Sequence, residues 1–401
     1  MKVLQIINSV DPAGGGVVEA VNQLGLTMMS MGHRVEIASL DALDAPFLTR
    51  SPLPVYALGP ASFGYGYSAK LVPWLRANRS QYDAVVVNGL WQFHSFAAWR
   101  ALRNSHTPYV VYPHGMLDPW FKKEYPLKHL KKWLYWPWAE YRVLRDAQAV
   151  LFTCEEERLL ARNSFWLYRC HEVVVSLGTS NPTGEAQREI REFFRSYPHL
   201  AGKNLALFMG RIHPKKGCDL LIEAFAKVLL RHSNWHLVMA GPDQVGLQAE
   251  LQRRAEQLGV ASRISWTGML SGELKWGALR AAEIFVLPSH QENFGIAVAE
   301  ALAAGVPALI SDKVNIWREV LAAEAGLVAE DTLEGACRVL QSYLDMPEEK
   351  KLAMRESARA CFAERFEIGK AAENLEVVLS RISGLHAKTD DRCHELLQTQ
   401  S

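Results

Sequence analysis

Residues 2–40, KVLQIINSVDPAGGGVVEAVNQLGLTMMSMGHRVEIASL, establish the first structural unit of the chain. An apolar run over residues 3–7 predicts a buried strand, and a glycine loop at residues 14–16 follows it. Residues 17–31 predict a helix that stops at Gly32, and residues 34–40 predict a second strand. A strand, a crossover helix and another strand form a βαβ unit, which lays the two strands parallel in one sheet.

The same alternation continues outward from this unit. Further strands are predicted at residues 84–87, 109–112, 149–153 and 173–176. The pattern then restarts, with strands at 205–209, 236–240, 264–267, 284–287 and 307–310 and helices at 218–231 and 247–258. Two such series predict an α/β protein made of two Rossmann-like, doubly wound domains.

We place the domain boundaries where the strand pattern is interrupted. We expect an N-terminal domain over residues 1–180 and a C-terminal domain over residues 203–365. Prolines and glycines between them predict a linker over 180–203 that contains a helix at 185–194. Residues 348–382 predict long helical structure, and we expect the helix at 366–384 to pack back on the N-terminal domain. The polar tail, residues 385–401, is expected to be flexible.

Composition excludes several classes of protein. The 401 residues are 49% hydrophobic and 22% charged, with a net charge of +1, so nothing in the overall charge attracts nucleic acid. The six cysteines lack the spacing of metal ligands or redox pairs, which favours reduced thiols. We find neither a signal peptide nor an apolar run of about 20 residues, and therefore expect a cytoplasmic protein, soluble or peripheral to a membrane.

Three glycine-rich or charged loops follow predicted strands, at the edge where doubly wound sheets bind ligands. Gly14, Gly15 and Gly16 would let the backbone approach an anion at a helix start, although a plain tight turn explains them equally well. The loop GRIHPKKG, residues 210–217, gathers Arg211, Lys215 and Lys216. We favour phosphate binding there over a solvated charged loop, because the loop lies between a strand and a helix start.

Two carboxylates mark the third loop. Glu292 precedes a predicted helix and Glu300 lies inside it, among apolar residues where a carboxylate needs a partner. Eight residues along a helix span about 12 Å. That length is comparable to the distance from a sugar across a diphosphate to a ribose, whose vicinal hydroxyls carboxylates bind well. A purely structural ion pair for Glu300 fits the same spacing.

At this point a resemblance to a known family becomes visible. The segment ENFGIAVAE, residues 292–300, resembles the E-x7-E motif of retaining GT-B glycosyltransferases. More narrowly, the chain resembles glycosyltransferase family 4, the "glycosyl transferases group 1" family. The similarity includes GGGVVEAV at 14–21, GHRVEI at 32–37, YPHGML at 112–117 and GRIHPKKG at 210–217, in that order, and extends to about residue 382. This ordered combination is far more specific than a single E-x7-E match.

The resemblance implies two domains that face a cleft, with the acceptor on the N-terminal side and the donor on the C-terminal side. It implies that Arg211 and Lys216 bind the donor diphosphate, that Glu292 holds the donor sugar and that Glu300 holds the ribose. His114 would face the sugar, with a structural histidine as the alternative; together with Arg211, Lys216 and Glu292 it forms the expected catalytic set. The remaining expected donor contacts are Gly15, Gly16, Gly268, Met269, Leu270, Asn293, Phe294 and Gly295.

The implied chemistry needs neither a metal nor another cofactor, and the sequence lacks the D-x-D motif of metal-dependent sugar transferases. Family members retain anomeric configuration, with the leaving phosphate taking the acceptor proton. We therefore expect transfer from a UDP- or GDP-sugar to a glycan or lipid-linked saccharide in bacterial surface polysaccharide synthesis. The alternatives are a sugar-nucleotide epimerase of the same fold and a non-catalytic nucleotide-sugar-binding protein.

The stretch between Lys122 and Arg145 is rich in lysine and tryptophan. One interpretation is an interfacial helix that contacts anionic lipid head groups. The other is an amphipathic helix of about ten residues, bounded by Pro126 and Pro137, that packs on its own domain. We favour packing for the tryptophans, and leave the lysines as candidates for a phosphate-bearing acceptor or a membrane.

Overall fold

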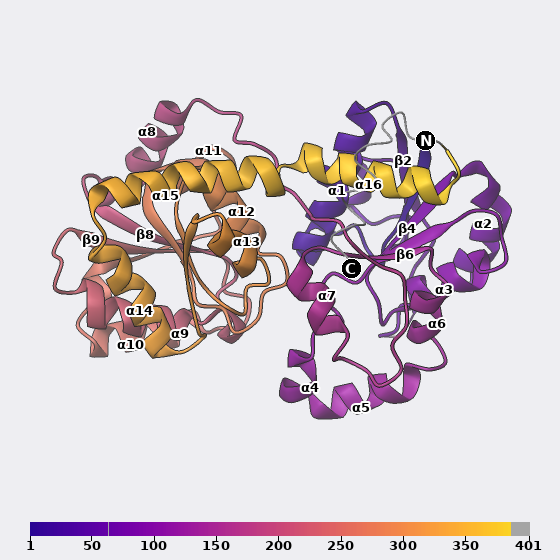
Figure 1. Ribbon diagram of the computed structural model, residues 1–401, viewed down its shortest axis with the longest axis horizontal. Coiled ribbons are helices and arrows are strands. Elements are labelled where there is room, and N and C mark those ends of the chain that lie inside the picture. Colours follow the sequence, from indigo (N-terminus) through magenta and orange to yellow (C-terminus); the bar gives the residue numbers. More distant parts are fainter. Residues whose placement is uncertain (63, 386–401) are drawn as a thin grey trace. The chain divides into compact units, whose positions relative to one another are not determined.

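The computed structural model describes residues 1–62 and 64–385, which form two compact α/β units (Figure 1). Unit 1 comprises Met1–Gly178 together with the chain from Ile368 onward, and unit 2 comprises Thr179–Glu367. Each unit is a parallel sheet flanked by helices, which confirms the predicted pair of Rossmann-like domains. The predicted tail, apart from Leu385, lies outside the described residues.

The described part of unit 1 is built on seven parallel strands in the order β3-β2-β1-β4-β5-β6-β7. They are β1 Lys2–Ile6, β2 Arg34–Ser39, β3 Val55–Ala57, β4 Ala84–Asn88, β5 Tyr109–Tyr112, β6 Ala149–Phe152 and β7 Glu172–Val174. The helices are α1 Gly16–Ser30, α2 Leu71–Asn78, α3 Phe93–Leu102, α4 Trp120–Glu124, α5 Pro126–Tyr135, α6 Glu140–Arg145, α7 Glu155–Ala161 and α16 Ile368–Ile382. Every residue of β4, β5 and β6 is buried, because helices cover both faces of a parallel sheet.

Unit 2 repeats this plan with six strands in the order β10-β9-β8-β11-β12-β13. They are β8 Asn204–Met209, β9 Trp235–Ala240, β10 Ile264–Gly268, β11 Ala282–Leu287, β12 Ala308–Ser311 and β13 Gly326–Ala329. Its helices are α8 Ala186–Ser196, α9 Cys218–Ala224, α10 Gln248–Gln257, α11 Gly272–Ala281, α12 Ile296–Ala303, α13 Trp317–Ala322, α14 Leu333–Leu344 and α15 Glu348–Cys361. The strand order reverses between β8 and β11, and the carboxyl ends at such a switch point are where these folds bind ligands.

The predicted linker is instead part of unit 2. Helix α8 packs closely on α11, where Phe193 is fully buried and the buried Glu189 pairs with Arg280 at 3.0 Å. The glycines and prolines around α8 therefore mark turns within the unit. Burial of the apolar side of α8 explains why residues 180–203 join the unit that follows them.

This α8–α11 contact leads to a test of stability. Gly277 in α11 lies so close to α8 that a Cβ there would collide with the backbone oxygen of Glu189. We expect Gly277→Ala to lower the free energy of unfolding of unit 2 by about 1–3 kcal/mol, the usual cost of overpacking. Denaturant titration measures this change. Gly369→Ala is the matched control, because a Cβ at that helical glycine meets open space and should be neutral or slightly stabilising.

The C-terminal helix α16 belongs to unit 1, where it packs on α1 and places Glu376 3.3 Å from His33. The predicted helical run over 348–382 is interrupted before it. A π-helix, Phe362–Phe366, ends at the extended Glu367, which forms an isolated bridge with Thr179. The chain therefore leaves unit 1 and returns to it through two segments that lie side by side.

No helix within residues 1–62 and 64–385 is long and apolar enough to cross a bilayer. The five described cysteines carry free thiols, as their spacing predicts.

Candidate active site

The charged loops of unit 2 come together at the switch point. The loop of residues 210–217 follows β8 and the loop of residues 288–295 follows β11, and these two strands are hydrogen-bonded neighbours. Parallel strands end at the same edge of the sheet, so both loops project from one edge. The strand order therefore places the two sequence motifs next to each other at one edge of the unit 2 sheet.

The two loops are in direct backbone contact. The carbonyl oxygen of Lys215 accepts hydrogen bonds from the His290 N–H at 2.8 Å and the Ser289 hydroxyl at 2.9 Å. Gly217 has a left-handed backbone (φ 63°), and a Cβ there would collide with the Pro288 carbonyl oxygen. Glycine is required here for both reasons. These contacts fix the position of Lys216 between Lys215 and Gly217.

Lys216 forms an ion pair with Glu292 across the two loops. Both side chains are largely buried, with 15% and 21% of their surface exposed. Burial, followed by the positive charges of Lys215 and Arg211, lowers the pKa of Lys216 to about 7. The contact with Glu292 acts in the opposite direction, because a neighbouring carboxylate favours the ammonium form. Lys216 and Glu292 therefore form a largely buried ion pair close to two further cations, Lys215 and Arg211.

Arg211 supplies a second cation to this edge. Its side chain is exposed, and within the described residues it has no ion pair or hydrogen bond. It is therefore available to an anion from solution. Burial, followed by the positive charges of Arg211, Lys215 and Lys216, lowers the pKa of His213 in the same loop.

The backbone around Glu292 is fixed on both sides. Its N–H donates to the Lys313 oxygen at 2.9 Å, and its oxygen accepts from the Asn315 N–H at 3.0 Å. The ring of Phe294 is buried edge-on against Phe366, with ring centroids 5.6 Å apart.

The chain then enters α12 through a left-handed glycine. Gly295, at φ 75°, is the N-cap of α12. Within the described chain, the N–H groups of Phe294 and Gly295 donate no hydrogen bond. Free N–H groups at a helix start favour an anion or a sugar hydroxyl. Asn293 points its side-chain oxygen at Asn315 Nδ2, 3.4 Å away.

Glu300 is in the second turn of α12 and is 7% exposed. Lys275 of α11 donates to its Oε1 at 2.8 Å, which supplies the partner that the apolar surroundings require. The ion pair with Lys275 agrees with the structural alternative for Glu300. A carboxylate accepts several hydrogen bonds, however, and Lys275 contacts only one of its oxygens, so Glu300 keeps acceptor capacity for a ligand. Lys275 could not be predicted from the sequence, because it lies in a different helix, α11, and no motif surrounds it.

The predicted base-binding segment ends β10. Gly268 is left-handed (φ 67°), and its oxygen accepts from the Gly241 N–H at 2.8 Å. Met269 is 76% exposed while Leu270 is buried. The segment thus presents backbone and one flexible side chain at the same sheet edge, two strands from β8.

The predicted residues of unit 1 lie at the carboxyl edge of its own sheet. His114 follows β5 with a left-handed backbone (φ 50°), which is uncommon for a residue other than glycine and is typical of functional sites. Its Nε2 lies 3.1 Å from Asn88 Oδ1, and the Asn88 amide donates to Gln5 Oε1 at 2.8 Å. Burial lowers the pKa of His114 to about 4, so the ring is neutral near pH 7. Because Nε2 donates to Asn88, Nδ1 is left as an acceptor for a hydroxyl.

The turn after His114 is held by a carboxylate that the sequence did not reveal. Glu157 is buried and accepts from the Gly115 N–H at 2.5 Å. It also accepts from the N–H and the hydroxyl of Thr153, at 2.7 and 2.6 Å. Gly15 and Gly16 lie where β1 passes into α1, and Gly15 has φ 74° with open space around its Cβ position.

A second buried carboxylate organises the loop after β4. Glu140 is fully buried and accepts from the Trp91 N–H at 2.8 Å and the Ser95 hydroxyl at 3.1 Å. Trp91 has a left-handed backbone (φ 71°), and its indole N–H donates to the Met116 oxygen at 2.9 Å. Burial raises the pKa of Glu140 to about 7, against these hydrogen bonds and the charge of Lys132.

This buried acid predicts a pH dependence of stability. The folded chain holds a proton on Glu140 up to a higher pH than the unfolded chain, whose glutamates titrate near 4.5. The contribution of Glu140 to stability therefore falls as pH rises from 4.5 through 7. We expect Glu140→Gln to gain stability relative to the wild type between pH 5 and 8, by on the order of 3 kcal/mol.

Urea titrations of both proteins at several pH values measure this difference. Buried His94 and His114 affect wild type and variant alike, so their contributions cancel. Glu349→Gln at an exposed position controls for the substitution itself. A difference that stays constant with pH would contradict the assignment.

Within residues 1–62 and 64–385, no group of three or more histidine, cysteine, aspartate or glutamate side chains is placed to hold a metal ion. The charged groups described above are Arg211, Lys215, Lys216 and Lys275 and the carboxylates of Glu292 and Glu300, and each carboxylate contacts a lysine.

Comparison with known proteins agrees with this arrangement. The "glycosyl transferases group 1" family model matches residues 189–360, and the "glycosyl transferase 4-like domain" model matches residues 15–178. The chain belongs to glycosyltransferase family 4. The two matches fall one in each unit and include every site residue predicted above.

Curated relatives of this glycosyltransferase are themselves sugar transferases. A GDP-mannose-dependent alpha-(1-6)-phosphatidylinositol dimannoside mannosyltransferase of Mycobacterium tuberculosis is 25% identical over the full length of both chains. The lipopolysaccharide core biosynthesis mannosyltransferase LpsB of Rhizobium meliloti is 30% identical over 34% of this chain and 40% of its own.

Solved structures share the fold of the glycosyltransferase. HepE of Anabaena, in complex with UDP and glucose, matches 95% of this chain and 100% of its own, with a TM-score of 0.74 and 16% identity. WaaG, a glycosyltransferase involved in lipopolysaccharide biosynthesis, matches 95% and 100% with a TM-score of 0.68 and 18% identity. At these identities the likeness establishes the fold.

Proposed function

We propose that this glycosyltransferase moves a sugar, with retention of anomeric configuration, from a UDP- or GDP-sugar to a glycan or lipid-linked saccharide. We further propose that it needs no metal and acts in bacterial surface polysaccharide synthesis. The observation that carries the proposal is the ion pair between Lys216 and Glu292 where β8 and β11 end, on a loop that also carries the exposed Arg211. Relatives that use GDP-mannose or bind UDP and glucose support both bases.

Each group at the edge of unit 2 has a chemical task in this proposal. The leaving diphosphate gains negative charge as the glycosidic bond breaks, and fixed cations lower the energy of that charge most where water is limited. Lys216 is largely buried and Arg211 is exposed, and both would bind the diphosphate. The N–H groups of Phe294 and Gly295 would add uncharged donors.

The carboxylates would position the sugar and the ribose. Glu292 is held rigidly by its backbone bonds and by Lys216, and its oxygens would accept sugar hydroxyls. Glu300, held by Lys275, would accept the ribose hydroxyls. In unit 1, the neutral ring of His114 would accept a sugar hydroxyl through Nδ1. The leaving phosphate would take the acceptor proton, and no side chain is assigned as general base.

The experiment begins with a thermal-shift screen of the purified full chain against UDP- and GDP-sugars. A donor at 100 times its Kd adds about 2.7 kcal/mol of stability. The donor found is then incubated with saccharide acceptors, with and without EDTA, and nucleoside diphosphate release and the anomeric configuration of the product are measured. We expect release that EDTA leaves unchanged and a retained configuration.

The same reaction separates the alternatives. An epimerase would convert the donor to an isomeric nucleotide sugar without releasing nucleoside diphosphate. A non-catalytic binder would be stabilised by the donor without consuming it. Inverted configuration, or loss of turnover in EDTA that added Mg²⁺ restores, would contradict the corresponding part of the proposal.

A further inference from the structure

Helix α5 of unit 1 turns its apolar side towards solvent. Leu127, Leu130 and Leu134 follow the three-and-four spacing of one helix face, and they are 83%, 56% and 63% exposed. All ten residues of α5 are at least partly exposed. Figure 1 shows α4 and α5 at the margin of unit 1, beyond the sheet.

The polar side of α5 faces the protein instead. The Lys132 ammonium lies 4.6 Å from the centre of the Trp91 ring, and burial lowers its pKa. His129 stacks on Phe165 with ring centroids 5.0 Å apart, and the Tyr135 hydroxyl contacts that of Tyr65. An amphipathic helix ordinarily buries its apolar face, so this orientation is inverted.

This orientation corrects one of the expectations from the sequence. Trp136 is fully buried, as packing on the domain predicts, and the helix ends before Pro137 as expected. Trp133 and Trp138, in contrast, are 42% and 69% exposed. The amphipathic pattern identifies two faces but not which of them turns inward.

The apolar surface continues onto the loop of residues 162–166. Trp166 is 65% exposed, and its ring centre lies 6.0 Å from that of Trp133. Between α5 and this loop runs a groove of about 670 Å³, lined by Lys122, His129, Trp133, Phe165 and Trp166 among others. We call Leu127, Leu130, Trp133, Leu134, Trp138 and Trp166 the α5 surface.

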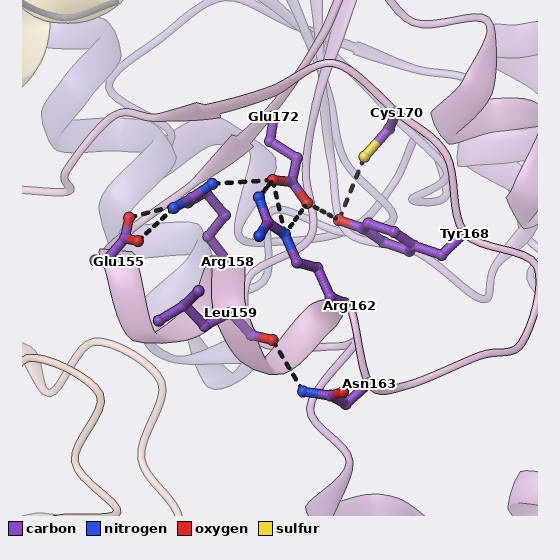
Figure 2. A network of polar contacts seen from close by, with 8 residues as sticks. All are labelled: Glu155, Arg158, Leu159, Arg162, Asn163, Tyr168, Cys170 and Glu172. Atoms are coloured by element: carbon purple, nitrogen blue, oxygen red, sulfur yellow. Dashed lines mark hydrogen bonds and ion pairs between the residues drawn. The ribbon is translucent and has the colours of Figure 1, made fainter. Parts of the chain in front are cut away.

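A network of polar contacts anchors the loop that carries Trp166 (Figure 2). Arg162 points towards Glu172, with Nη2 2.5 Å from Oε2, and Arg158 reaches the same oxygen at 3.1 Å. The Tyr168 hydroxyl donates to Glu172 Oε1 at 3.0 Å and accepts from the Cys170 thiol at 3.3 Å. Burial acts to raise the pKa of Glu172, but the bonds from Arg162 and Tyr168 hold it below its usual value.

Two things follow from this network. Contacts with Glu172 fix the loop on both sides of Trp166, through Arg162 before it and Tyr168 after it, so the exposed ring is carried by an ordered backbone. The charge of Arg162 is also neutralised by Glu172, so the basic character of this region comes from lysines.

Positive charge gathers beside the α5 surface. Residues 122–132 contain five lysines and one acid, Glu124, in a chain whose net charge is +1. Lys122, Lys123 and Lys131 have no ion pair with any described residue. A second copy of the chain would bring the same lysines against each other, and like charges across an interface oppose association.

We propose that the α5 surface docks on an anionic lipid bilayer, with the leucines and tryptophans in the head-group boundary and the lysines against the phosphates. Apolar side chains on one face with lysines at its flank are the arrangement of helices that lie in a membrane interface without crossing it. Tryptophan is suited to that boundary, since its ring is apolar and its N–H polar. The proposal does not depend on the sugar-transfer chemistry.

The test is co-sedimentation of the full chain with vesicles. We expect binding to vesicles of phosphatidylcholine with 30% phosphatidylglycerol, weakened at high salt, and little binding to pure phosphatidylcholine. The variant Leu127→Gln/Leu130→Gln/Leu134→Gln should bind at least tenfold more weakly. These side chains are exposed, so the thermal midpoint should be unchanged, and Leu352→Gln, 62% exposed on α15, is the matched control.

The second arm tests the charges and the alternative occupant. We expect Lys122→Glu/Lys123→Glu/Lys131→Glu to lose the preference for phosphatidylglycerol. Wild-type binding by both triple variants, or no binding by the wild type, would overturn the proposal. Sedimentation velocity that shows a dimer abolished by the leucine variant would overturn it in favour of self-association.

Discussion

Replacing Lys216 by methionine should lower kcat about 10²–10³-fold, the usual cost of removing one group that stabilises charge in a transition state. Methionine keeps the length of the side chain and its apolar contacts, so the loss is confined to the ammonium. The variant also leaves Glu292 without its ion-pair partner, next to the expected diphosphate, where its charge would repel the leaving group. Loss of the ammonium and repulsion by the unpaired Glu292 both lower kcat, so this substitution has the largest expected effect on activity.

Steady-state release of nucleoside diphosphate measures the effect. Lys350→Met, at an exposed position of α15, is the matched control and should keep the wild-type rate. Lys216→Met turning over at the wild-type rate, with an unchanged thermal midpoint, would remove Lys216 from the phosphate site. The double variant Lys216→Met/Glu292→Gln should recover part of the loss if repulsion by Glu292 contributes.

Replacing Glu300 by glutamine should raise the donor KM by about 10–100-fold and change kcat less, because hydrogen bonds to a charged group are worth about 1.5–3 kcal/mol. The carboxylate would contact the ribose, which lies away from the reacting bond, so its loss affects binding of the ground state and the transition state alike. Glutamine keeps the shape of the side chain and leaves Lys275 an oxygen to bind.

A donor with a deoxyribose makes this test specific. The wild type should bind a 2′-deoxy or a 3′-deoxy donor more weakly than the ribose donor. Glu300→Gln, which already binds the ribose donor weakly, should bind that deoxy donor only slightly more weakly still. Lys275→Met is the companion variant, since it breaks the ion pair but keeps the carboxylate. If Glu300 were only structural, both variants would lower stability, and Glu300→Gln would lose as much affinity on removal of the ribose hydroxyl as the wild type does.

The sequence predicts the central strands of both sheets better than the edge strands. Fully apolar runs such as β5, Tyr109–Tyr112, identify strands that are buried on both faces. The edge strands β3 and β13 were not predicted, because they are short and partly exposed, as Tyr56 in β3 shows. The helix α8 was found, but its apolar pattern could not say which of the two units it joins.

In the candidate site, too, local sequence patterns predict some residues, while others are placed only by tertiary packing. Residues inside motifs, such as Lys216 and Glu292, can be proposed as site residues from the sequence, because glycines and charges next to a strand point to ligand chemistry. Their partners cannot, because Lys275 and Asn315 come from other elements and are brought close only by tertiary packing. Glu157, which holds the turn after His114, is one of three adjacent glutamates, and the sequence gives no sign that this one turns inward.

The packing of α16 on α1 has a consequence for the synthesis of the chain. Unit 2 is complete once Glu367 has left the ribosome, but α1 still lacks the cover that α16 provides. Ala372, Leu375 and Leu379, buried in the finished fold, are among the last described residues to be made. The first unit to be translated is therefore the last to be finished, and a nascent chain stalled before residue 368 would present a folded second unit behind an unfinished first one.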